Sequence, residues 1–283
     1  MPSRESEVLI LRTYPYREAD LIVSFITRDE GKLRGIARGA RRPKSRWGSG
    51  LERLSHVRLF YYRRENQDLA KLDRCELSGP PIFLKADYAT SVALDFLAEV
   101  SDQLLPEHEP NDAYFRLLLL VRDEMWAGVQ GELDPRPAAV PVGRVAGEAE
   151  TAGHVGGGGN SDVPGWLWRA VTYFALWSVR LGGWLPPLNV CLQSGVEFGP
   201  EEPAFFERAQ PGLFSADFRT RDCWPMAAAS RALAGEMLRH PLPALREQPW
   251  DRGTAEDLRR FLIQRLEAQF EQRLKTVPVL DQL

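Results

Sequence analysis

The spacing of the apolar residues changes once along this 283-residue chain, near residue 80. Before that point they alternate with polar residues in short runs, as in strands buried on one face. After it they recur every three or four residues, as on one face of a helix. This order of patterns predicts an α+β fold, with a β domain at 1–80 and an α-helical domain at 81–283.

Five alternating runs are predicted as strands in the first domain: 6–14, 21–27, 32–40, 57–64 and 69–77. Turns containing Gly and Pro separate them, the longest at 41–50. Five short strands in a domain of this size indicate the Greek-key barrel called the OB-fold, which often binds single-stranded nucleic acid. In the fourth run we expect Phe60 and Tyr62 to point into the core, because alternate side chains of a strand face inward.

Positive charge is concentrated in this predicted barrel. Residues 1–75 hold 17 Lys and Arg against 10 Asp and Glu, whereas the remaining residues carry a net charge of −10. Segment 32–46 has no acidic residue and seven basic ones: Lys32, Arg34, Arg38, Arg41, Arg42, Lys44 and Arg46. Guanidinium groups bind phosphate with paired hydrogen bonds, so the segment indicates a site for a polyanion. Trp47 is a candidate for stacking on a base, and a solvated basic loop is the alternative interpretation.

The same domain contains a series of short motifs: Glu7-x-Leu9-Ile10-Leu11-Arg12, Glu18-Ala19-Asp20-Leu21-Ile22-Val23, Thr27-x-x-x-Gly31-Lys32-Leu33, Ala37-Arg38-Gly39-Ala40-Arg41 and Ser45-x-x-Gly48. In this order they resemble the N-terminal barrel of the RecO DNA-repair family. The resemblance implies a non-catalytic protein that binds single- and double-stranded DNA and anneals strands. It also implies that the protein helps load recombinase onto DNA coated by single-strand-binding protein. The implied protein partners are RecR and the acidic C-terminal tail of the single-strand-binding protein.

The second domain is predicted to contain helices at about 85–106, 111–126, 166–181 and 225–240, and a last helix from Thr254. Asn111 and Thr254 are the expected capping residues, and Pro225 is expected in a first helical turn. Residues 134–164, rich in Ala, Gly and Pro, are predicted to be a flexible insertion. We expect the acidic tail to bind this domain in an apolar pocket edged by basic residues, with Arg259, Arg260 and Arg265 as candidates.

Residues 185–226 are predicted to form a degenerate zinc-knuckle-like lobe. Cys191 and Cys223 stand where many RecO-like proteins carry the first cysteine of each knuckle, whereas Ser194 and Met226 replace the second. Structural zinc requires four sulfur or imidazole ligands, so we predict that the lobe folds without the metal and that the protein has no cofactor.

No catalytic or nucleotide-binding motif is present, and no apolar run is long enough to cross a membrane. Three cysteines at distant positions form no disulfide framework, which favours the reducing cytoplasm, with association to the bacterial nucleoid following from the RecO resemblance. Two alternatives remain: an RNA-binding barrel, and a metal-dependent nuclease using Asp20, Asp29 or Glu30.

Overall fold

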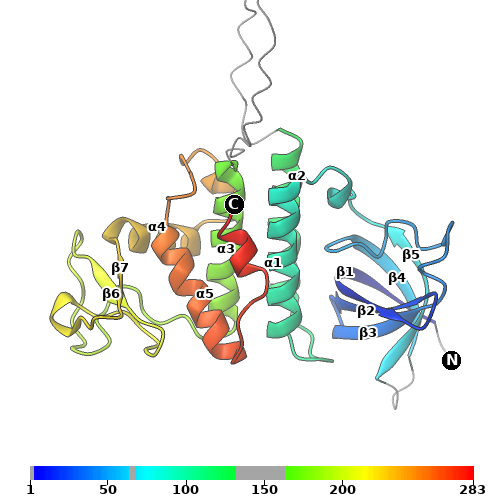
Figure 1. Ribbon diagram of the computed structural model, residues 1–283, viewed down its shortest axis with the longest axis horizontal. Helices are drawn as coiled ribbons and strands as arrows, with labels where there is room; N and C mark the ends of the chain where they lie inside the picture. Colours follow the sequence, from blue (N-terminus) through cyan, green and yellow to red (C-terminus); the bar gives the residue numbers. More distant parts are fainter. Residues whose placement is uncertain (1–2, 64–67, 132–162) are drawn as a thin grey trace, which may run out of the picture.

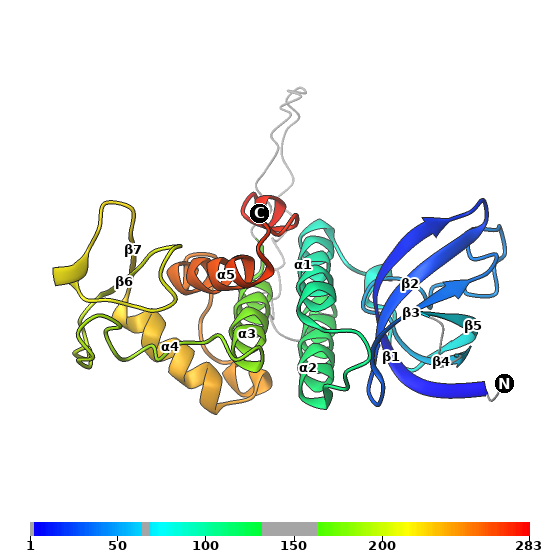
Figure 2. The ribbon, with the colours of Figure 1, turned by 90° about the horizontal axis from the view of Figure 1, so that it is seen from below.

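The computed structural model describes residues 3–63, 68–131 and 163–283. These residues form a β-barrel at one end of the molecule, a helical bundle in the middle and a small lobe with two short strands at the other end (Figures 1 and 2). The predicted α+β class, with a barrel followed by helices, is confirmed. The predicted insertion at 134–164 lies almost entirely outside the described residues.

The barrel is closed by five strands: β1 (Ser3–Tyr16), β2 (Asp20–Thr27), β3 (Gly31–Ala37), β4 (His56–Tyr62) and β5 (Leu69–Leu77). Their order is β1-β2-β3-β5-β4, and only the β3–β5 pair is parallel. This is the topology expected of an OB-fold. Alternation along each strand supplies the barrel interior, which contains Val8, Ile10, Val23, Phe25, Leu33, Ala37, Trp47, Leu51, Val57, Leu59, Tyr61, Ala70 and Leu72.

The predicted orientation of the aromatic residues in β4 was wrong. Tyr61 is completely buried in the barrel, whereas Phe60 and Tyr62 are partly exposed on its outer face. Val57 and Leu59 set the inward phase of this strand, and Tyr61 continues it. The sequence alone does not show which of the three consecutive aromatic residues points inward, because each of them is apolar enough for a core.

The barrel and the helices share a core. Leu9, Leu11, Ile26 and Leu54 are buried, and all four pack with the apolar side chains of the helical bundle rather than inside the barrel. A barrel cut out of the chain would expose these four side chains to water. The helical bundle therefore stabilises the barrel by covering one side of it.

A buried arginine joins the two parts at the same junction. Arg122, on α2 (Asp112–Val129), is completely buried and donates hydrogen bonds to the backbone carbonyl oxygens of Leu54 and Pro80. The Leu54 bond is 2.9 Å long, and Arg122 also pairs with Asp123 at 2.6 Å. Because two carbonyl groups depend on one side chain, we expect the junction to be sensitive to its loss.

The other helices of the bundle are α1 (Tyr88–Leu104), α3 (Gly165–Leu181), α4 (Ala228–Arg239), α5 (Glu256–Phe270) and α6 (Val277–Leu280). Short 3₁₀ turns lie at Ile82–Leu84, Ala216–Phe218 and Leu242–Leu245. The expected cap of α2 is confirmed, since Asn111 accepts a 3.0 Å hydrogen bond from the backbone N–H of Tyr114. α3 lies between the other helices and is buried on nearly every side (Figure 2).

Two predicted helix starts were wrong. Pro225 lies in the short strand β7 (Trp224–Met226), which pairs with β6 (Ala204–Phe206), and α4 begins later, at Ala228. Thr254 does not cap α5; its backbone N–H and its hydroxyl both donate to Asp251, at 2.7 Å each. The Thr254 side chain therefore forms a local turn with Asp251 instead of capping the helix as predicted.

Candidate nucleic-acid interface

The basic loop that follows β3 is held in place by the barrel. The backbone N–H of Gly39 donates to Asp20 at 2.8 Å, and that of Arg41 donates to the carbonyl oxygen of Ala19 at 3.0 Å. Gly39 has a φ of +66°, a conformation that residues with a Cβ rarely adopt. The loop is therefore fixed to the β1–β2 turn, which limits the directions in which its basic side chains point.

Five of the predicted cations are exposed on this loop: Arg38, Arg41, Arg42, Lys44 and Arg46. Arg46 lies 3.9 Å from the carboxylate of Asp73, and Arg41 donates only to the backbone carbonyl of Glu18, at 3.4 Å. Within the described part of the chain, no carboxylate pairs with Arg38, Arg42 or Lys44. No carboxylate among the described residues neutralises the charge of these three side chains. The loop therefore presents a cluster of cations that attracts anions.

Lys32 and Arg34, unlike the loop cations, have partners in the helical domain. Both side chains point outward from β3, as predicted, but that part of the outer face meets the helical domain. The Lys32 ammonium donates to the backbone carbonyl of Asp102 at 2.5 Å, and burial lowers the pKa of Lys32. Arg34 forms an ion pair with Glu107. These two cations therefore stabilise the domain junction.

Trp47 also differs from expectation. Its side chain is only 3% exposed and belongs to the barrel core. The indole N–H donates to the carbonyl oxygen of Arg38 at 3.0 Å, and the guanidinium of Arg46 lies 5.1 Å from the ring centroid. The ring is thus enclosed beneath the basic loop, where it supports the loop instead of offering a face to a base.

Two aromatic residues outside the predicted set do reach the surface beside basic side chains. On the outer face of β4 and β5, Phe60 lies opposite Arg74, and Tyr62 lies opposite Lys71. The guanidinium of Arg74 is 4.0 Å from the centroid of Phe60, and the Lys71 ammonium is 5.9 Å from that of Tyr62. The phase of Val57, Leu59 and Tyr61 was the sequence signal that would have placed both rings outside.

The four positions of the degenerate knuckles lie in different surroundings. Cys191 and Cys223 pack with a small aromatic cluster of Phe198, Phe205 and Phe214. Met226 is completely buried in the core of the helical domain instead, and the exposed Ser194 hydroxyl accepts the backbone N–H of Val196 at 3.3 Å. Among the described residues no third His, Cys, Asp or Glu joins the two thiols in a group, and two thiols are fewer than the four ligands of structural zinc.

The carboxylates considered for a nuclease have structural partners. Asp20 accepts the backbone N–H of Gly39, and Asp29 accepts the hydroxyl of Ser6. Glu30 accepts hydrogen bonds from Tyr61 at 2.6 Å, Arg4 at 2.6 Å and Arg63 at 3.0 Å. Burial opposes its ionisation, but these bonds outweigh that effect and lower the pKa of Glu30. No group of three or more His, Cys, Asp or Glu side chains in the described part of the chain is placed to hold a metal ion.

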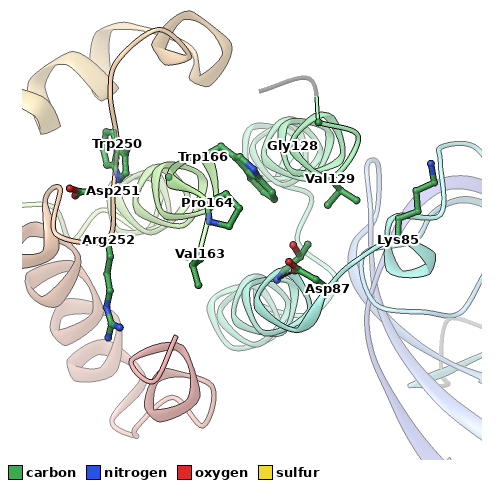
Figure 3. Close-up of a pocket in the computed structure, with 13 residues that line it drawn as sticks. Lys85, Asp87, Gly128, Val129, Val163, Pro164, Trp166, Trp250, Asp251 and Arg252 are labelled. Carbon is green, nitrogen blue, oxygen red and sulfur yellow. Dashed lines mark hydrogen bonds between the residues drawn. The ribbon is translucent and has the colours of Figure 1, made fainter. Parts of the chain in front are cut away.

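A cavity of about 820 Å³ lies at one end of the helical bundle (Figure 3). Trp166, Trp250 and Arg252 line it together with Lys85 and Asp87 from the start of α1. The described residues of its lining include no His, Cys or Ser and so offer none of the usual nucleophile and base pairs of acyl transfer.

Comparison with known proteins identifies the family. A family model described as "Recombination protein O N terminal" matches residues 1–81, which contain the whole barrel. The DNA repair protein RecO of Koribacter versatilis (strain Ellin345) is 40% identical over 280 residues, which cover 99% of each chain. The chain belongs to the RecO family of DNA repair proteins. RecO of Anaeromyxobacter sp. (strain K) is 26% identical over 277 residues, covering 97% of this chain and 94% of the relative.

RecO membership confirms the resemblance found in the first 77 residues and extends it through the helical domain and the lobe. It gives the protein a role in DNA repair and recombination. Among the described residues, no helix is both long enough and apolar enough to cross a membrane.

Proposed function

We propose that this RecO-family protein is a non-catalytic recombination mediator that binds single- and double-stranded DNA through the loop after β3. Arg38, Arg41, Arg42, Lys44 and Arg46 bind phosphates, and strand annealing follows when two bound strands are brought together. The protein then helps load recombinase onto strands coated by single-strand-binding protein. The observation that carries this proposal is the group of exposed cations on a loop fixed to an OB-fold barrel.

Phosphate binding by such a cluster has a measurable signature. Each phosphate neutralised by Lys or Arg releases condensed counterions, so affinity falls steeply as salt increases. We expect the full chain to bind labelled single strands and duplexes with strong salt dependence and with little sequence preference. Reversing the charge of Arg38 and Arg41 together should weaken binding to every sequence and reduce the salt dependence. Unchanged affinity and salt dependence would remove the proposed site.

Two other functions give different results in simple assays. Incubation of labelled DNA with Mg²⁺ or Mn²⁺ should produce annealed product and no cleavage, whereas cleavage would support the nuclease. Competition between DNA and RNA strands of matched sequence should favour DNA, and preference for RNA would support an RNA-binding barrel.

The acidic tail of the single-strand-binding protein is proposed to bind a pocket of about 370 Å³ beside α5. Its lining contains apolar side chains (Trp168, Ile263, Val277 and Leu280), four arginines (Arg208, Arg252, Arg259 and Arg260) and three acidic residues (Glu256, Glu267 and Asp281). Arg208 pairs with Glu267, so an acidic ligand would have to compete with carboxylates already present. The Trp168 ring is 3% exposed, and its indole N–H has no acceptor among the described residues. A buried donor without a partner beside several guanidinium groups favours a ligand with a carboxylate and an apolar side chain.

The structure distinguishes the three arginines considered for this contact. Arg260 is exposed at the pocket and pairs with Glu256 at 3.2 Å. Arg259 also lines the pocket, but it is 5% exposed, and burial lowers its pKa to about 10. Arg265 is buried elsewhere and donates to backbone carbonyls of residues 207 and 208, so its expected role in tail binding is withdrawn.

Arg260 and Arg239 form a matched pair for testing the pocket. Each is an exposed helix residue with an ion pair within one turn, Arg260 to Glu256 and Arg239 to Glu236. Binding of a synthetic peptide carrying the acidic tail sequence should weaken at least tenfold in Arg260→Glu and stay unchanged in Arg239→Glu. Equal binding by the two variants would exclude this pocket.

The remaining expectations are included in the proposal. RecR should form a complex with the full chain, which co-elution in gel filtration tests. Metal analysis of the purified chain should find less than one zinc per ten molecules, because the knuckle positions do not provide four ligands. Fluorescent fusions in the bacterial cell should locate to the cytoplasm at the nucleoid.

A further inference from the structure

We propose that the outer face of β4 and β5 binds the bases of a single DNA strand whose phosphates lie on the basic loop. Phe60 and Tyr62 supply stacking surfaces, and Arg74 and Lys71 supply the charges beside them. This inference rests on the proposed DNA binding and adds the form of DNA that this face selects. A duplex keeps its bases stacked on one another, so only a single strand can use the two rings.

The register of the sheet brings the four side chains into two neighbouring pairs. Phe60 is opposite Arg74 and Tyr62 is opposite Lys71 across the β4–β5 ladder. Ile36 of β3 is the neighbour of Lys71 on the other side of β5. Two aromatic rings on β4 therefore lie beside two cations on β5, and Arg74 also pairs with Glu76 at 3.6 Å.

This face is continuous with the basic loop. The loop packs along the second half of β5, where Arg46 approaches Asp73 at 3.9 Å and the Cys75 thiol donates to the carbonyl oxygen of Trp47 at 3.7 Å. Arg74 lies between these two contact points in the strand. The Arg74–Phe60 pair is therefore next to the loop contact at Asp73, and the second pair, Lys71–Tyr62, lies two residues further along β4 and three further along β5.

The helical domain covers a different side of the barrel. It packs on outward-facing residues of β1 and β2, including Leu9, Leu11 and Ile26, while β5 lies on the side of the barrel away from α1 (Figures 1 and 2). Phe60 and Tyr62 remain partly exposed. Aromatic side chains on the outside of a barrel beside basic side chains match the stacking platforms and basic grooves of single-strand binders.

The experiment compares a Phe60→Leu/Tyr62→Leu variant of the full chain with the unmodified protein. Leucine keeps an apolar side chain on the strand but offers no flat face. Affinity for a labelled oligo-dT strand should fall about 5- to 160-fold per ring that stacks on a base. Affinity for a duplex of the same length, and the salt dependence of both, should stay unchanged because the cations are retained.

Two controls keep the result interpretable. Tyr88→Leu removes an aromatic ring that is 69% exposed on α1, and it should leave single-strand affinity unchanged. A Phe60→Tyr/Tyr62→Phe variant keeps both rings and should restore single-strand binding. Circular dichroism and thermal unfolding show whether each variant folds like the unmodified chain.

The outcomes separate this inference from the proposed function. Equal losses for single strands and duplexes, or no loss for single strands, would overturn the stacking face while leaving phosphate binding by the loop intact. Failure of the unmodified protein to bind either form of DNA would overturn the proposed function itself.

Discussion

Neutralising the three loop cations that have no carboxylate partner should remove most of the salt-dependent DNA affinity. Arg38, Arg42 and Lys44 are exposed, and among the described residues no acidic side chain pairs with them. Their charges are therefore available to phosphate without first breaking an ion pair. We consider a variant in which all three are replaced by alanine in the full chain.

Counterion release gives the size of the effect. Each phosphate contact contributes about 0.9 to the slope of log affinity against log salt for a duplex, and about 0.7 for a single strand. If each of the three cations binds one phosphate, the slope should decrease by about 2.7 for a duplex and about 2.1 for a single strand. At about 0.1 M salt, this corresponds to a loss of affinity of about 500-fold and about 100-fold, respectively.

Fluorescence anisotropy of a labelled strand and its duplex, titrated at several KCl concentrations, measures both slopes. The matched control is Arg34→Ala, which removes a cation of the same barrel that is already paired with Glu107 at the junction. Its slope should equal that of the unmodified protein. The reasoning is refuted if the triple variant keeps the original slope, or if Arg34→Ala lowers the slope as much as each loop substitution does.

Three further predictions concern stability. Arg122→Met leaves two buried carbonyl groups at the junction without their donor and should lower the free energy of unfolding by about 3 kcal/mol in urea titrations. Glu30→Gln should cost about 1.5 kcal/mol at neutral pH. The pKa of Glu30 is lowered in the folded protein, so its carboxylate stabilises the fold at pH values above its ordinary pKa of 4.5. This stabilisation is lost as the pH falls, and the free energies of unfolding of the variant and the unmodified protein should therefore converge in acid. Gly31→Ala should be destabilised more than Gly131→Ala in thermal unfolding, since both glycines have positive φ but only at Gly31 does a Cβ overlap the backbone of Glu109.

Much of the architecture could be predicted from local patterns. Alternating apolar residues predicted all five barrel strands, and the change to helical spacing predicted where the bundle begins. The motifs from Glu7 to Gly48 lie within the segment that matches the RecO family model, and they indicate the family by themselves. The Asn111 cap was predictable because its hydrogen bond joins residues only three apart in the chain.

The site was predicted less completely, because a strand pattern says which side chains share a face but not what covers that face. Lys32 and Arg34 were placed correctly on the outside of β3, yet only the packing of the helical domain brings Asp102 and Glu107 to them. The same limit applies to Trp47, whose position in a basic loop gave no indication that the barrel interior has room for its ring.

The amino-acid sequence alone determined the order of the elements, the closed barrel and the number of cations near it, since these depend on periodicity and composition along short stretches of chain. Tertiary structure decided which cations remain free, which aromatic rings reach the surface and which arginines edge the pocket beside α5. Those outcomes depend on contacts between residues far apart in the chain, such as Lys32 with Asp102 and Arg122 with Leu54. Whether a side chain is buried or paired at such a contact depends on how whole helices and strands pack. A local sequence pattern does not contain that information.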